Sequence, residues 1–132
     1  MKRTLRIFAL SIALLMALGA LSASQSARMQ RAQRCFSQNR DALTDLAHRF
    51  DAGERSGLSA EGIRGAQRLV ITVNPARMEV HTEAFGIAPS SVYSGLLYSP
   101  EQAPLPVEKG VGDNRVITRR ICGDWYYFEA SY

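Results

Sequence analysis

The sequence predicts an α+β domain behind an N-terminal hydrophobic helix, with one amphipathic helix packed on an antiparallel sheet of about five strands. Three observations predict this fold. Residues 7–23 carry no charge, residues 28–51 repeat apolar side chains at helical spacing, and residues 67–131 contain short runs in which apolar and polar side chains alternate. We therefore divide the chain into an N-terminal segment, residues 1–24, and a single α+β domain, residues 25–132.

The uncharged run from Ile7 to Ala23 follows three basic residues, as in a signal peptide or a transmembrane anchor. A helix of this length spans about 26 Å, slightly less than the hydrocarbon core of a bilayer, which is about 30 Å thick. Small residues around Ser24 are compatible with cleavage, so a retained anchor and a removed signal both stay open. We expect a cell-envelope location: inner-membrane anchored with an exported C-terminal domain, or periplasmic or secreted after cleavage.

Charge bias leaves the orientation of this run open, because Arg28, Arg31 and Arg34 nearly match the three basic residues before it. The formal charge of +4 comes largely from the N-terminal segment, which holds three of the 16 basic residues and none of the 12 acidic ones. The remaining domain is nearly neutral and has no basic stripe, which argues against nucleic-acid binding. We expect the membrane and an envelope protein as partners, and the oligomeric state stays open.

The two cysteines, Cys35 and Cys122, are far apart in sequence, and an even cysteine count in an exported chain predicts a disulfide. A loop of this length contributes on the order of 4–5 kcal/mol to stability when the bond is unstrained. The alternative is two buried free thiols, which becomes the favoured interpretation if the domain faces the cytoplasm.

A single amphipathic helix is predicted from Arg28 to Asp51, because this stretch contains no Gly or Pro and Gly53 follows it. Its apolar stripe consists of Met29, Ala32, Phe36, Leu43, Leu46 and Phe50, with Asn39 filling a gap. The stripe is expected to pack under the sheet. The alternative is a short coiled coil in which Asn39 sets the register and the protein oligomerises through residues 29–50.

The strands are predicted from period-two alternation and from the turn residues between them. We expect strands at residues 67–73, 78–83, 92–99, 116–121 and 125–131, a loop at 86–91, and no strand between Pro100 and Pro106.

Aromatic residues are the candidate binding residues. In an extended strand, Trp125 and Tyr127 lie on one face while Tyr126 and Phe128 lie on the other. One face is expected to pack under the helix, and the second is either covered or left as a patch for a partner. The tentative binding set is Tyr93, Tyr98, Trp125, Tyr126, Tyr127 and Phe128.

Catalytic and metal-binding patterns are weak. Glu79, His81 and Glu83 alternate on one strand face, but neighbours on that face are about 6.5–7 Å apart, so they do not converge on one ion. Ser90 and Ser91 lack a nucleophile-elbow motif, and the glycines at 110 and 112 lack the following helix of a phosphate-binding loop. We expect no cofactor, no metal and no enzymatic activity. The alternative is a small envelope hydrolase whose residues meet only in the fold.

The overall plan resembles that of type IV pilins, but those carry a Gly-Phe processing site and an early Glu, and residues 5–23 contain no Glu. A second resemblance covers residues 85–131, through Phe85-Gly86, Pro89-Ser90-Ser91, Tyr98-Ser99-Pro100 and Trp125-Tyr126-Tyr127. These residues resemble small, uncharacterised, N-terminally anchored bacterial envelope proteins. The resemblance implies an envelope location and C-terminal strands, and it implies no mechanism. The expected function is that of an exported or membrane-tethered, non-enzymatic binding module.

Overall fold

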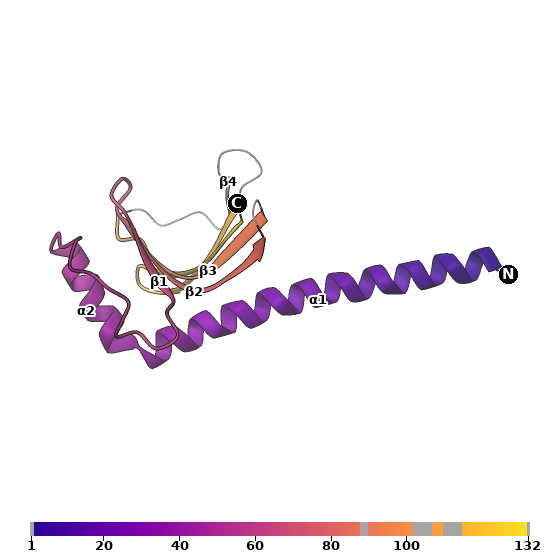
Figure 1. Ribbon diagram of the computed structural model, residues 1–132, viewed down its shortest axis with the longest axis horizontal. Helices are drawn as coiled ribbons and strands as arrows, with labels where there is room; N and C mark the ends of the chain where they lie inside the picture. The colour runs from indigo at the N-terminus through magenta and orange to yellow at the C-terminus, as the bar shows by residue number, and fades with distance from the viewer. Residues whose placement is uncertain (1, 88–89, 102–106, 110–114, 132) are drawn as a thin grey trace.

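The structure is a computed structural model that describes residues 2–87, 90–101, 107–109 and 115–131. Within these residues it contains two helices and a six-stranded antiparallel sheet, so the predicted α+β class is confirmed. The helices come first in the chain and lie together on one face of the sheet (Figure 1). The C-terminal part of α1 lies against this sheet, and its N-terminal part extends well beyond it.

The helices are α1, Lys2–Gln38, and α2, Arg40–Asp51. The uncharged run and the start of the amphipathic stripe therefore share one continuous helix. The prediction of a single helix from Arg28 to Asp51 is wrong, because the chain bends at Asn39, where the two helices form the open V of Figure 1. We call residues 7–16 of α1 the arm. Six large apolar side chains of the arm are exposed, namely Ile7, Leu10, Ile12, Leu14, Leu15 and Met16.

Asn39 lies at the bend, and its side chain bonds both to the end of α1 and to the loop after α2. Its Nδ2 donates to the carbonyls of Cys35 at 2.8 Å and Arg64 at 2.9 Å, and its Oδ1 accepts from the Arg64 N–H at 2.8 Å. Asn39 is buried, so these bonds satisfy an amide that would otherwise be costly to remove from water. The residue therefore fixes the helix junction to the loop after α2 rather than setting the register of a coiled coil.

No helix among the residues that the structure describes is both long enough and apolar enough to cross a membrane.

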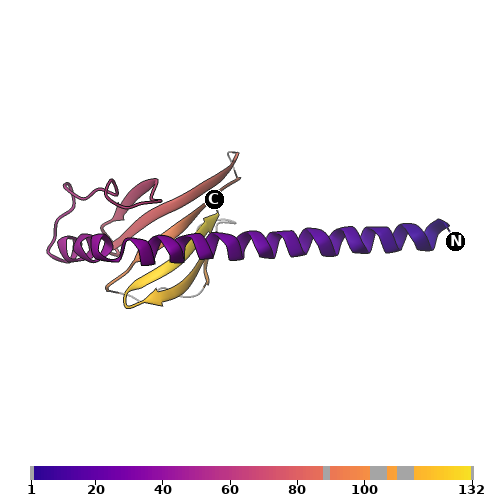
Figure 2. The ribbon, with the colours of Figure 1, turned by 90° about the horizontal axis from the view of Figure 1, so that it is seen from below.

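The sheet has the strand order β1-β2-β3-β6-β5-β4, and every neighbouring pair is antiparallel. The strands are β1 Arg68–Thr72, β2 Arg77–Ile87, β3 Ser90–Tyr98, β4 Val107–Lys109, β5 Arg115–Cys122 and β6 Trp125–Ser131. All five predicted strands are present, and β4 is an additional one. Because β2 ends at Ile87 and β3 begins at Ser90, most of the predicted loop at 86–91 is strand. Viewed from the helix side, α1 crosses the middle of the sheet (Figure 2).

Apolar side chains are buried on both faces of the sheet. The helix face holds the larger cluster, in which Leu43 and Phe50 from α2 pack with Leu96, Tyr98 and Tyr127 from the strands. The opposite face holds a smaller cluster of Leu97, Tyr126, Phe128 and Ala130, with Val116 packed against it. The alternation of β6 therefore sends aromatic side chains into two separate cores.

A bulge in β2 changes which residues face the helices. The register shifts between His81 and Glu83, so one extra residue, Thr82, is inserted opposite β3. Gly95 lies beside the bulge, where a Cβ atom would come within 2.0 Å of the Val80 carbonyl oxygen. Only glycine fits this approach. After the bulge, Glu83 pairs with Ser94 and faces α1.

Candidate functional site

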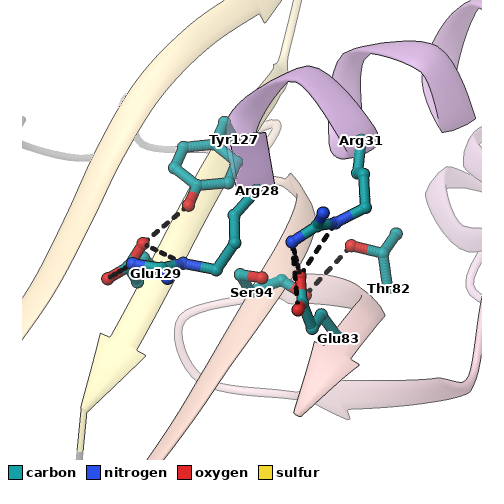
Figure 3. Close-up of polar contacts among 7 residues, drawn as sticks. All are labelled: Arg28, Arg31, Thr82, Glu83, Ser94, Tyr127 and Glu129. Carbon is teal, nitrogen blue, oxygen red and sulfur yellow. Dashed lines mark hydrogen bonds and ion pairs between the residues drawn. The ribbon is translucent and has the colours of Figure 1, made fainter. Parts of the chain in front are cut away.

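A row of polar side chains lies between the sheet and the C-terminal part of α1. Glu83 on β2 pairs with Ser94 on β3, and Ser94 pairs with Glu129 on β6. Arg28 and Arg31 lie above this row and come from one face of α1, because residues three apart are neighbours on a helix. Figure 3 shows each arginine directed at a different glutamate. We call these five residues the polar layer.

Arg28 and Glu129 form the more buried of the two ion pairs. Nε and Nη2 of Arg28 donate to Oε2 and Oε1 of Glu129 at 3.1 and 3.0 Å, and the two side chains are 10% and 14% exposed. The Tyr127 hydroxyl also donates to Oε2 of Glu129, at 2.7 Å. Such a bidentate, hydrogen-bonded arrangement is the geometry in which a partly buried ion pair offsets its loss of water.

The environment of this pair shifts two pKa values. Burial alone would lower the pKa of Arg28, but the hydrogen bond and charge of Glu129 outweigh it, so the pKa is raised. The pKa of Tyr127 is raised well above its usual value, first by burial and then by the bond to Glu129. Arginine charged and tyrosine protonated are the forms that stabilise the Glu129 carboxylate.

Arg31 and Glu83 form the more exposed pair. Nη2 of Arg31 lies 2.7 Å from Oε2 of Glu83, and Nε donates to the same oxygen at 3.1 Å. Their side chains are 52% and 29% exposed, so water screens their attraction more strongly than that of Arg28 and Glu129. Between the pairs, Ser94 is 1% exposed, and its Oγ has no hydrogen-bond partner among the residues that the structure describes.

The polar layer fixes how α1 lies on the sheet. Each arginine must face its own glutamate, so a rotation or sliding of α1 would break both pairs and would leave the buried Glu129 without its arginine. No nucleophile with an adjacent general base occurs among these five residues, and their chemistry is that of a docking contact. Beside the layer, a groove of about 450 Å³ runs between α1 and β5, where Met29, Tyr127 and Arg119 form part of its wall.

The candidate binding aromatics lie on both faces of the sheet. Tyr98, Trp125 and Tyr127 are buried on the helix face, and Tyr126 and Phe128 are buried on the opposite face. Tyr93 is partly exposed, and the centroid of its ring lies 5.4 Å from that of the His81 ring, at an interplanar angle of 47°. The other five side chains are buried by the chain itself, and a role of this set in binding a partner stays a prediction.

The predicted disulfide is not formed in the structure, where both cysteines are free. Cys35 is buried at the helix junction, where its Sγ donates to the Arg64 carbonyl at 3.5 Å. Burial raises the pKa of this thiol. Cys122 is exposed at the end of β5, with its Sγ 3.9 Å from Nη2 of Arg40. The two sulfur atoms therefore have different partners.

His81 is the one predicted candidate for chemistry that gains a close carboxylate. Its Nε2 lies 2.8 Å from Oε2 of Glu79, but the ring is 7% exposed and lies between Tyr93 and Phe128. Glu83 faces α1 instead, because of the bulge, so the three alternating residues are separated. No group of three or more His, Cys, Asp or Glu side chains that could hold a metal ion occurs within the described part of the chain.

The remaining predicted candidates do not join this arrangement. Ser90 begins β3, and the glycines at 110 and 112 lie outside the described residues. The sequence reasoning missed the polar layer. Two features of the sequence could have indicated this layer. Glu129 occupies a position of an otherwise aromatic strand that faces the helices, and Arg28 lies beside the apolar stripe of the helix.

Comparisons with models of known families, with curated proteins and with solved structures find no match.

Proposed function

We propose that this protein is a non-enzymatic binding module of the cell envelope that is tethered to the membrane by the N-terminal part of α1. The proposal has two components. The arm and the uncharged run that contains it enter the lipid, and the sheet domain is held in a defined orientation to bind a protein partner.

The exposed apolar surface of the arm is the observation that carries the proposal. Six large apolar side chains between Ile7 and Met16 are 47–71% exposed. On a protein in water, contiguous exposed apolar surface of this kind marks a site of contact with a membrane or with another protein. The run is uncharged and follows Lys2, Arg3 and Arg6, a pattern that suits lipid chains beside anionic headgroups.

The polar layer supports the second component. It fastens the domain to the same helix that carries the arm, and Asn39 fastens the far end of that helix to the loop after α2. A domain mounted in this way has a fixed orientation relative to its tether, which suits presentation of one surface to a partner.

Flotation of the full chain with liposomes tests the tether. Wild type should float with vesicles that contain anionic lipid. A variant with Leu10→Lys and Leu14→Lys should remain at the bottom, because each charge in the run costs about 2.5–3.5 kcal/mol on insertion. The matched control is Gln30→Lys, which adds a charge at an exposed position outside the run and should float normally. Equal flotation of the double variant contradicts the tether, as does a mature N-terminus near Ser24.

A topology reporter tests the envelope location. Alkaline phosphatase fused after Tyr132 should be active, because this enzyme requires an oxidising compartment. An inactive fusion of normal abundance would place the domain in the cytoplasm and would overturn the location.

A hydrolase is the competing function, and the Glu79–His81 contact favours it. A general base positioned by a carboxylate is one part of a catalytic dyad. The ring of His81 is nevertheless enclosed by Tyr93 and Phe128, and Gly95 lies between the strands that carry His81 and Phe128. Hydrolysis of a panel of ester, peptide and glycoside substrates that is lost in His81→Gln would favour the hydrolase over the binding module.

A further inference from the structure

The groove between α1 and β5 lies just after the uncharged run. Gln25, Ser26 and Met29 of α1 form one of its walls. The run ends at Ala23, so at a rise of about 1.5 Å per residue this wall lies about 3–9 Å beyond it along the helix. The polar headgroup layer of a bilayer is about 5–8 Å thick on each side of the hydrocarbon. A run that enters the lipid therefore places the groove at the level of the headgroups.

The opposite wall of the groove belongs to the sheet. Arg119 on β5 pairs with Tyr127 on β6, and Ile117 pairs with Glu129, so the side chains of Ile117 and Arg119 lie on the face that α1 covers. The volume of about 450 Å³ falls in the range of about 300–1,000 Å³ that is usual for small-molecule sites. In Figure 1 the sheet lies against only the C-terminal part of α1, so the groove is at the end of the domain nearest the arm.

The groove combines an apolar surface with a few polar groups. Most of the surface is apolar and comes from Met29, Ile117 and Tyr127. An amide, a hydroxyl and a guanidinium also line it, and no carboxylate does so within the described part of the chain. A mainly apolar site with few polar groups suits an amphiphilic ligand, whose head and chain need different surroundings.

Arg119 gives the groove its charge. Its side chain is exposed and forms no ion pair with any residue that the structure describes, and its Nη1 lies 3.7 Å from Sδ of Met29. A thioether is a weak acceptor, so the guanidinium keeps its donors for a stronger one. Both glutamates of the polar layer are already bonded to Arg28 and Arg31. Arginine binds phosphate through two parallel N–H···O bonds, which makes a phosphate the fitting anion.

We propose that the groove between α1 and β5 binds the headgroup of an anionic phospholipid of the membrane that holds the tether. The phosphate accepts hydrogen bonds from Arg119, with Gln25 and Ser26 as further donors on the α1 wall. The glycerol and the first methylene groups of the acyl chains contact Met29 and Ile117. This inference rests on the proposed tether and names the class of lipid that the domain prefers.

Other phosphate compounds fit the groove less well. A zwitterionic headgroup brings an ammonium group into a groove whose described lining has no carboxylate to receive it. A soluble phosphate ester would bond to Arg119 but would leave the apolar wall in contact with water. An anionic phospholipid satisfies the guanidinium and covers the apolar wall together.

Native mass spectrometry of the delipidated full chain, released from micelles of a non-ionic detergent, tests the proposal. The probes are dioctanoyl phosphatidylglycerol and dioctanoyl phosphatidylcholine, which differ only in the headgroup. The phosphatidylglycerol should form a saturable adduct of one lipid per chain, and the phosphatidylcholine should bind more weakly by about tenfold. Absence of the phosphatidylglycerol adduct, or equal binding of both lipids, overturns the proposal.

Removal of one arginine locates the charge that binds the lipid. Arg119→Gln should weaken the phosphatidylglycerol adduct by about tenfold. The matched control is Arg120→Gln, which removes the same charge from an exposed side chain on the opposite face of β5 and should leave the adduct unchanged. Unchanged binding by Arg119→Gln, or equal losses in the two variants, overturns the proposal.

Filling the groove tests the site without changing its charge. Ser26→Trp places a large side chain in the α1 wall at an exposed position and should weaken the phosphatidylglycerol adduct by at least about tenfold. The control Gln30→Trp adds the same ring at an exposed position of α1 that does not line the groove, and should bind normally. Normal binding by Ser26→Trp overturns the proposal even if Arg119→Gln fails to fold.

Two further readouts separate the alternatives. Loss of the lipid adduct on addition of an equal concentration of glycerol 3-phosphate would identify a soluble phosphate ester as the occupant and overturn the lipid. Flotation with liposomes reports on the tether alone. A wild-type chain that does not float but keeps its phosphatidylglycerol adduct contradicts the tether and supports the groove. A chain that floats without forming the adduct supports the tether and overturns the groove.

Discussion

The arm and the docked part of α1, residues 28–38, share one helix but reverse the usual distribution of side chains. In the docked part, Arg28 is among the buried residues and is bonded to the sheet. In the arm, Leu, Ile and Met side chains are exposed. Because the backbone is continuous, the difference arises from what each part contacts. The docked part therefore owes its burial to the sheet beneath it, whereas the arm has no such cover within the described residues.

Removal of Arg28 should have the largest effect on this comparison. Arg28→Met leaves the Glu129 carboxylate buried with Tyr127 as its remaining donor, so the free energy of unfolding should fall by about 3 kcal/mol. Urea denaturation measures the loss. The double variant with Glu129→Leu should recover most of it, because no unpaired charge remains. A single variant as stable as wild type would mean that the pair does not hold the docked part.

Removal of the Asn39 amide should have the next largest effect. Asn39→Leu leaves the Arg64 N–H without its acceptor and removes the amide donor to the Arg64 carbonyl, which should cost about 2 kcal/mol in thermal or urea unfolding. Sedimentation should show an unchanged oligomeric state, since Ala32, Leu43 and Phe50 are already buried in the core. A larger particle in this variant would instead support a coiled coil through residues 29–50.

Removal of Arg31 should have a smaller effect than removal of Arg28, and this contrast sharpens the role of burial. The Arg31 side chain is 52% exposed, so Arg31→Met should lower the free energy of unfolding by less than about 1 kcal/mol. The same urea titration serves as the measurement. Equal losses for Arg28 and Arg31 would show that position along the helix, rather than exposure, sets the strength of these contacts.

A charge in the arm should have the smallest effect on the domain. Leu14→Lys should change the unfolding free energy by no more than about 0.5 kcal/mol, because Leu14 is 64% exposed. The fluorescence of Trp125, the single tryptophan, reports on the core, where its ring lies 6.0 Å from that of Phe36. A large shift of this transition would mean that the arm packs against the domain.

Local patterns predicted the elements well, and long-range contacts explain the failures. Alternation located the five longer strands, but β4 is three residues long and is held in place by pairing with β5, so it has no period of its own to detect. The bend at Asn39 depends on a bond to Arg64, 25 residues away, which no helical pattern contains. An uninterrupted apolar stripe predicted one helix because the bend leaves the spacing of that stripe intact.

The candidate site was less predictable than the fold. Alternation in β6 correctly separated Trp125 and Tyr127 from Tyr126 and Phe128, but it could not reveal that both faces would be covered. Glu83 was assigned to the same face as His81, and the bulge at Thr82 moved it to the other. Register shifts of this kind arise from the close approach at Gly95, which depends on the neighbouring strand.

Because α1 is one continuous helix, a movement of its N-terminal end is transmitted to the sheet. A helix of 37 residues is about 55 Å long, and the polar layer grips it near one end. A small change in the angle at which the free end is held therefore becomes a larger displacement of the β1 edge, and a twist of the helix about its axis turns the whole sheet with it. The surroundings of the first two dozen residues thus set the direction in which the rest of the molecule faces.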